Sequence, residues 1–182
     1  MNANLERYDF PIGSVHYASD GRLIYPPLYD EMTLDEVFTA YLQEIETAVR
    51  TGWFCSIGHL DIPKRYLPKR CRMYEPADIH DRLQPVFQAM IGSSVGFEIN
   101  TSGIRQAPKT SMPGPTIVRW YADAGGHSYH HGYRFPHRAD DWAGVPLTLE
   151  MLRLCGVPAV MSFRERQGTP VPIDQLLARG AA

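Results

Sequence analysis

The feature that most constrains this chain is a regular alternation of short apolar segments with longer segments of helical period. The apolar segments, rich in β-branched and aromatic residues, predict strands at 10–17, 53–62, 95–102, 127–133 and 158–166. The segments of helical period predict helices at 32–52, 76–92, 115–124 and 146–156. Strands that are apolar on both faces and alternate with helices favour a parallel sheet covered by helices.

The clearest of the predicted helices is the one at 32–52. Thr33 is its expected N-cap, and Glu36 stands three residues later, as in a capping box. Gly52 is expected to end the helix. Apolar residues at helical spacing predict its buried face: Leu34, Val37, Phe38, Tyr41, Leu42 and Ile45.

The alternation fits either an open doubly wound sheet or a piece of a β/α barrel. Neither a GxGxxG loop nor a Walker A motif follows the first strand. Instead, polar residues close each of the first three strands: His16, then His59 and Asp61, then Glu98, Asn100 and Thr101. Functional residues at the carboxyl ends of successive strands are typical of barrels. The fold class we predict is therefore α/β, with parallel strands alternating with helices in a barrel.

Composition excludes several classes of protein. The 182 residues, 44% hydrophobic and 21% charged with a net charge of −2, predict one globular domain over 1–182. This near-neutral charge argues against a partner that is a nucleic acid or an anionic membrane surface. We see neither a membrane-length apolar stretch nor a signal peptide at MNANLERYDF. Three cysteines without metal-site spacing suit a reducing cytosol, so we expect a cytoplasmic protein.

The seven histidines differ in what their positions suggest. His80 lies between Asp78 and Asp81 on a polar helix face, where solvent exposure is expected. His16 and His59 each follow an apolar strand that contains a glycine, which suits a metal ligand. A buried histidine bonded to a carbonyl group is an equally good interpretation of these two positions. The remaining histidines fit no standard zinc spacing: His127, His130, His131 and His137.

Several segments together resemble one protein family. They are YDFPIGSVHY, WFCSIGHLDIPKRY, FEINTSGIR, PGPTIVRWYADAGG, HRADDWAG and LRLCGVPAVMSFRERQGTPVPI. In this order they resemble the PHP (polymerase and histidinol phosphatase) metallohydrolases, specifically the histidinol-phosphatase branch. The resemblance implies a distorted (β/α)7 barrel that holds up to three divalent metal ions, Mn, Zn or Fe. Its implied reaction is hydrolysis of a small phosphorylated metabolite, histidinol phosphate, to histidinol in histidine biosynthesis, with a metal-bound water as the attacking group.

The resemblance also implies roles for individual residues. Three histidines match metal ligands of the family: His16, His59 and His137. Three polar residues match positions expected to hydrogen-bond those ligands: Glu98, Asn100 and Asp61. Lys64 and Arg105 match basic positions that contact phosphate, although an ordinary surface charge is an equally good interpretation of each.

The sequence departs from the family pattern at its beginning. The family has a His-x-His strand and further ligands before YDFPIGSVH, and this chain starts just before that segment. We therefore expect an incomplete barrel that lacks the N-terminal βα units and binds fewer metal ions. Its exposed edge would allow an oligomer, and its activity would be impaired.

The last family motif is also broken. Where Gly-Thr-Asp-Ser-His is expected, the chain has HHGYRFPH at 130–137. Tyr129 to Arg138 can be encoded so that the same bases, read one position later, give ITTGTDSHT. Our hypothesis is that a shifted reading frame produced this segment, and sequencing the gene would test it.

Two other functions remain open. One is a non-catalytic PHP remnant that binds a metal or a partner. The other is a PHP module associated with a DNA polymerase, which IGHLDIPKRY and the near-neutral charge disfavour.

Overall fold

A central parallel sheet organises the chain, as predicted. The computed structural model describes residues 7–71, 74–126, 129–131 and 144–180. Four strands lie in the order β1-β2-β3-β4, and each neighbouring pair is parallel. They are β1 (Ile12–Gly13), β2 (Ser56–Ile57), β3 (Gly96–Ile99) and β4 (Tyr129–His131). The described residues thus form an α/β fold with an open sheet rather than a closed barrel.

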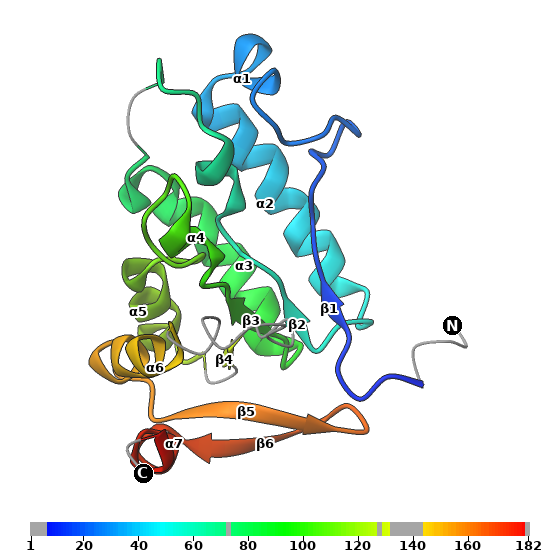
Figure 1. Cartoon of the computed structure of the whole chain (residues 1–182). Helices are drawn as coiled ribbons and strands as arrows, with labels where there is room; N and C mark the ends of the chain where they lie inside the picture. Colours follow the sequence, from blue (N-terminus) through cyan, green and yellow to red (C-terminus); the bar gives the residue numbers. More distant parts are fainter. Residues whose placement is uncertain (1–6, 72–73, 127–128, 132–143, 181–182) are drawn as a thin grey trace.

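Helices connect the strands of this sheet (Figure 1). The α-helices are α1 (Leu28–Glu31), α2 (Leu34–Arg50), α3 (His80–Gly92), α4 (Ser102–Arg105), α5 (Pro115–Asp123), α6 (Gly144–Leu154) and α7 (Ile173–Gly180). Two short 3-10 helices are η2 (Ile62–Tyr66) and η3 (Pro76–Ile79). Helices α2 and α3 pack against each other, and α5 precedes β4. Each predicted helix is therefore present, with ends close to those expected.

The capping box and the terminating glycine that the sequence predicts for helix α2 are both present in the structure. The Thr33 hydroxyl accepts a hydrogen bond from the Glu36 N–H, and the Glu36 carboxylate accepts one from the Thr33 N–H, which completes the capping box. Gly52 follows the helix with a φ of +66°, a conformation that glycine adopts without strain. The predicted apolar face is buried except at Leu34, which is half-buried, and Phe38 and Tyr41 are fully enclosed.

The first two strands are much shorter than predicted. The segment 10–17 pairs with the sheet only at Ile12–Gly13, and Tyr17 makes an isolated antiparallel bridge with Leu23 instead. Ile12 is 39% exposed, so the prediction of a buried strand over 10–17 is wrong. The segment 53–62 pairs only at Ser56–Ile57, because the chain turns at His59 with a φ of +34° and continues into η2. Pro63 lies at the start of η2 and has no N–H to donate to a strand.

The C-terminal segment corrects the prediction of a further parallel strand. It folds as an antiparallel hairpin of β5 (Ala159–Arg164) and β6 (Gln167–Pro172). Glu165 and Arg166 both adopt positive φ values, 50° and 65°, as a tight hairpin turn requires. In Figure 1 this hairpin crosses below the parallel sheet. Its tip contacts the start of the chain, where the Glu165 N–H donates to the Asp9 carboxylate at 2.7 Å.

One apolar core lies between the sheet and its helices. Tyr121 of α5 contacts the ring of Phe97 in β3 and the ring of Phe87 in α3, with centroids 4.9 Å and 5.3 Å apart. These contacts join α3, β3 and α5 into one packed layer. Within the described ranges, every helix is too short or too polar to cross a membrane.

Candidate metal site

Two predicted ligands meet at the carboxyl ends of β1 and β2. His16 lies three residues beyond β1, and His59 lies two residues beyond β2. Their ring centroids are 4.9 Å apart, with an interplanar angle of 55°. The His16 side chain is exposed, whereas His59 is only 7% exposed. The pair therefore places an exposed imidazole beside a buried one.

The main chain of His59 is held from both sides. Its N–H donates to Glu98 Oε2 at 3.2 Å, across from β2 to β3. Its carbonyl oxygen accepts bonds from the Tyr41 hydroxyl at 3.1 Å and from the Ile62 N–H at 2.9 Å. Burial raises the pKa of Tyr41 well above its usual value, so this hydroxyl remains a donor. These bonds fix His59 in a left-handed conformation that residues other than glycine rarely adopt.

The ring of His59 is prepared to coordinate a metal ion. Its Nδ1 atom is buried and has no hydrogen-bond partner among the described residues. Burial, together with the nearby His16, lowers the pKa of His59 to about 4, so the ring is neutral at physiological pH. A neutral imidazole with an unpaired buried nitrogen fits a metal ligand better than a buried histidine bonded to a carbonyl group.

Glu98 connects the ends of β2 and β3. Besides the His59 N–H, its Oε2 accepts a bond from the Asn100 amide at 3.2 Å. Asn100 Oδ1 in turn accepts the Ser102 N–H at 3.0 Å, at the start of α4. Glu98 thus holds the main chain of His59, and Asn100 holds Glu98, while their role toward a metal ion stays a prediction.

Gly58 allows these strand ends to approach closely. A Cβ atom at this position would lie 2.8 Å from Ser14 Oγ and 3.4 Å from Glu98 Oε2. The Gly58 N–H also donates to the Gly13 carbonyl at 2.8 Å. The absence of a side chain at Gly58 therefore brings residues from β1, β2 and β3 to one place.

Asp61 and Lys64, which follow His59 in the sequence, form a buried ion pair. Lys64 Nζ lies 2.6 Å from Asp61 Oδ2, and the two side chains are 6% and 1% exposed. Lys64 also donates to the Ser111 carbonyl at 2.8 Å. Burial raises the pKa of Asp61, and the Lys64 ammonium opposes that rise. The interpretation of Lys64 as an ordinary surface charge is therefore wrong, because its side chain is buried. Its ammonium group holds the segment around Ser111.

The remaining predicted residues make other contacts, are exposed, or lie outside the described residues. The hydrogen bonds of Asp61 go to Lys64 and to the Gly114 N–H, rather than to either imidazole. Arg105 ends α4 and is exposed. His137 and most of the HHGYRFPH segment lie outside the described residues. Across 7–71, 74–126, 129–131 and 144–180, no group of three or more His, Cys, Asp or Glu residues could hold a metal ion. Two imidazoles are therefore what this part of the chain contributes.

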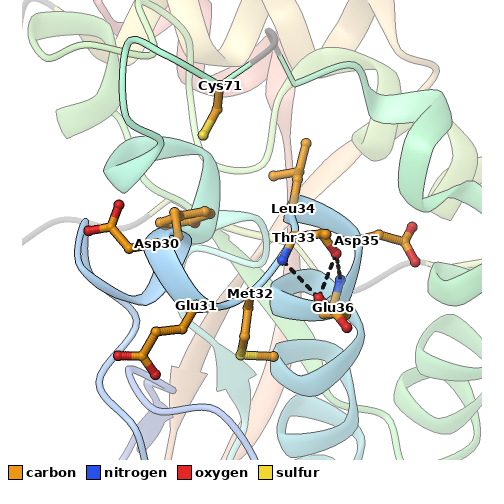
Figure 2. Close-up of a pocket in the computed structure, with 9 residues that line it drawn as sticks. Asp30, Glu31, Met32, Thr33, Leu34, Asp35, Glu36 and Cys71 are labelled. Carbon is orange, nitrogen blue, oxygen red and sulfur yellow. Dashed lines mark hydrogen bonds between the residues drawn. The ribbon is translucent and has the colours of Figure 1, made fainter.

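A hollow beside the N-terminus of α2 is rich in carboxylates (Figure 2). Each carboxylate already has a partner within the chain. Asp30 pairs with Arg70, Glu31 with Arg22, Asp35 with Arg82, and Glu36 completes the capping box with Thr33. These charges hold α1, α2 and their neighbouring segments together, so we do not assign a site to this hollow.

Tyr41 is the residue that sequence reasoning missed. It stands in the apolar face of the helix predicted at 32–52, and it does contribute to the core. Its hydroxyl makes a separate contact, because it donates a hydrogen bond to the carbonyl of His59, 18 positions away. A tyrosine rather than phenylalanine at a fully buried position was the available signal.

Comparison with known proteins places this geometry in context. No family model matches the sequence. A probable histidinol-phosphatase of Deinococcus radiodurans is 30% identical over 121 residues, which are 65% of this chain and 44% of that protein. The chain is therefore similar in sequence to a probable histidinol-phosphatase over 65% of its length. A second probable histidinol-phosphatase, from Thermotoga maritima, is 25% identical to this chain over 134 residues, which are 67% of this chain and 55% of that protein.

A solved structure shares the fold of this chain. It is the histidinol phosphate phosphatase of Lactococcus lactis, crystallised with zinc, L-histidinol and phosphate. The TM-score is 0.73 at 22% sequence identity, over 89% of this chain and 62% of that structure. The chain spans about half the length of the curated relatives that it matches.

Proposed function

We propose that this chain carries part of the active site of a metal-dependent phosphomonoesterase that converts histidinol phosphate to histidinol. The observation that carries the proposal is the pair of imidazoles of His16 and His59, with the buried Nδ1 of His59 unpaired. Two curated relatives are named as probable histidinol-phosphatases, which supports the substrate class. The same matches favour this branch over a polymerase-associated module.

In this proposal His16 and His59 hold a divalent metal ion. Glu98 and the bonds to the His59 carbonyl keep the buried ring in place, so little rearrangement accompanies binding. A bound divalent ion lowers the pKa of a coordinated water and neutralises charge on the phosphoryl oxygens. Zinc is our first choice because the Lactococcus lactis structure contains it, and manganese or iron are alternatives. We place His137 in the same site as a further ligand.

Of the two basic residues, Arg105 is a better candidate than Lys64 for the contact with phosphate. Arg105 is exposed at the end of α4, where an incoming anion can reach it. Lys64 is bonded to Asp61 and to the Ser111 carbonyl, so a contact with phosphate would require it to leave a buried carboxylate. Lys64 therefore acts mainly by fixing the segment around Ser111.

We also propose the finer architecture that the family implies. The parallel sheet is treated as part of a distorted (β/α)7 barrel within a single domain over 1–182. Its edge strand β1 pairs with β2 and with no other described strand, and Ile12 on it is 39% exposed. This edge is where an oligomer would form.

Metal binding by single-histidine variants tests the proposal. Titration of the purified chain with Co²⁺, followed by absorption spectroscopy, should show imidazole coordination, and His16→Ala and His59→Ala should each abolish it. His80→Ala is the matched control, because that ring packs against Trp120 and bonds Asp81. Phosphate release from histidinol phosphate is then measured on the metal-loaded chain. Cobalt binding that is unchanged in the His16 and His59 variants would overturn the proposal.

A non-catalytic metal-binding remnant is the second candidate function. The observation that favours it is the two-imidazole donor set within the described residues, because catalytic zinc sites use three protein ligands. Cobalt binding that depends on His16 and His59, without phosphate release, would select this candidate.

A further inference from the structure

Tyr41 connects the centre of helix α2 to the base of the candidate metal site. The side chain is fully buried, with 0% exposure. Its hydroxyl donates to the His59 carbonyl at 3.1 Å, although the two residues lie 18 positions apart in sequence. The aromatic ring alone would satisfy the apolar core, so the hydroxyl is the part that needs an explanation.

The acceptor of this bond is the main chain of a strained residue. His59 has a φ of +34°, which is an uncommon conformation for any residue other than glycine. Rotation about the N–Cα bond of His59 would relax this conformation, and it would turn both the carbonyl group and the ring. Tyr41 opposes that rotation at the carbonyl, while Glu98 holds the N–H on the other side at 3.2 Å.

The hydroxyl is not needed merely to satisfy the carbonyl. The His59 carbonyl also accepts the Ile62 N–H at 2.9 Å, so removing the hydroxyl leaves no buried oxygen without a partner. The bond therefore adds orientation more than stability. Because the ring that depends on it carries the unpaired Nδ1 beside His16, the orientation acts on the candidate ligands.

We infer that Tyr41 is a positioning residue, whose hydroxyl holds the His59 imidazole facing His16 in the geometry that binds a divalent metal ion. This inference rests on the proposed metal site and adds to it a residue outside the ligand set. Tyr41 does not touch the metal or the substrate, and it acts only through the main chain of His59.

The test compares Tyr41→Phe with Tyr121→Phe. Tyr121 is also fully buried, and its hydroxyl also donates to a main-chain carbonyl, that of Val95 at 3.3 Å. Both variants lose one oxygen atom from the core and keep the ring. Circular dichroism and thermal unfolding first establish that each variant is folded.

Two measurements are then made on each folded variant. Cobalt titration should show about tenfold weaker binding for Tyr41→Phe, the lower end of what loss of a residue supporting a ligand costs, and unchanged binding for Tyr121→Phe. In the metal-free chain, a nuclear Overhauser effect between the His16 and His59 rings should be present in the original protein and in Tyr121→Phe. It should be weakened in Tyr41→Phe.

The outcomes separate this inference from the proposed function. If the original chain binds no cobalt, the proposed metal site is overturned. The nuclear Overhauser effect between the His16 and His59 rings then still decides whether Tyr41 positions His59. If the original chain binds cobalt and Tyr41→Phe binds it equally well, the inference alone is overturned. Equal weakening in both tyrosine variants would also overturn it. Should Tyr41→Phe not fold, a slowly exchanging Tyr41 hydroxyl proton in the original protein supports the bond, and a rapidly exchanging one contradicts it.

Discussion

Gly58 and His59 are adjacent at the end of β2, and each supports the site through a property of its backbone. Gly58 has no side chain where Ser14 and Glu98 approach, and His59 is held at a φ of +34° by bonds at both its N–H and its carbonyl. The energetic cost of such a backbone conformation is of the order of 1–3 kcal/mol. The surrounding contacts must supply that cost, so the site depends on residues that never touch a ligand.

Gly58→Ala should disturb the site because its Cβ would lie 2.8 Å from Ser14 Oγ and 3.4 Å from Glu98 Oε2. We expect the free energy of unfolding to fall by about 1–2 kcal/mol from this overpacking, together with weaker cobalt binding. Urea unfolding measures the first effect. Gly92→Ala, at the end of α3 where nothing lies within 4 Å, is the control and should stabilise by up to about 1 kcal/mol. Equal losses of stability at the two positions would contradict this account.

Individual residues show how far sequence reasoning reaches. The meeting of His16 and His59 could be predicted, because the carboxyl ends of adjacent parallel strands lie at one edge of a sheet. The burial of Lys64 could not, since a lysine three residues after an aspartate is usually a solvated charge. Only the fold supplies the Ser111 carbonyl that completes its environment. The roles of these residues toward a metal or phosphate stay predictions.

Among the elements, helix α2 has the most complete local explanation. It begins at a capping box, buries one apolar face and is followed by Gly52 at positive φ. It also carries Tyr41, so its position along its own axis matters to the site. A helix that frays at its first turn would weaken that placement.

Thr33→Ala should destabilise the chain by about 1 kcal/mol through loss of the N-cap. Thr39→Ala is the matched control in the same helix. Its hydroxyl bonds the Asp35 carbonyl within the helix, and alanine is the better helix former, so little change or a small gain in stability is expected. Urea unfolding of both variants checks this, and a larger loss at Thr39 than at Thr33 would refute it.

The same capping box predicts a dependence on pH. Bonds from the Thr33 N–H and hydroxyl lower the pKa of Glu36 below its usual value of 4.5. The stabilisation is therefore complete above that usual value and is lost as the pH falls through the lowered one. The stability difference between Thr33→Ala and the original chain should accordingly shrink on acidification. A difference that grows on acidification would show that the ionised Glu36 carboxylate is not involved.

The periodic pattern predicted helices better than strands, for a physical reason. A helix satisfies its backbone bonds within itself, so the residues of α2 and α3 are sufficient to indicate it. A strand extends only as far as a partner pairs with it, which left β1 and β2 two residues long. The hairpin of β5 and β6 was missed because an apolar run cannot reveal whether its partner is parallel or antiparallel.

For the molecule as a whole, the β5–β6 hairpin connects the two ends of the described fold. Its turn bonds Asp9 through two N–H groups, those of Glu165 and Arg166. Phe163 packs on Phe10 with ring centroids 4.9 Å apart. The segment that leads into β1 is therefore held by the C-terminal part of the chain. The alternation of strands and helices, which is local along the sequence, could not predict this contact.

Asp9→Ala should loosen this connection without unfolding the hairpin. The Glu165 amide loses its acceptor, and we expect it to exchange hydrogen about two- to tenfold faster, which corresponds to a net hydrogen bond of about 0.5–1.5 kcal/mol. Amides in the paired interior of β5, such as that of Val160 opposite Val171, serve as the internal control and should keep their rates. Hydrogen exchange followed by nuclear magnetic resonance measures both. Acceleration along all of β5 would mean that Asp9 supports the whole hairpin.

The contact between Asp9 and Glu165 also bears on how the chain is made. The two residues are 156 positions apart, so during synthesis the lead-in to β1 emerges from the ribosome long before its partner exists. Contacts of such long sequence separation form late and slow the folding of a domain. The nascent chain must therefore carry this strand without the β5–β6 hairpin until Glu165 has been synthesised. Chaperones that shield exposed strand edges would act during that interval.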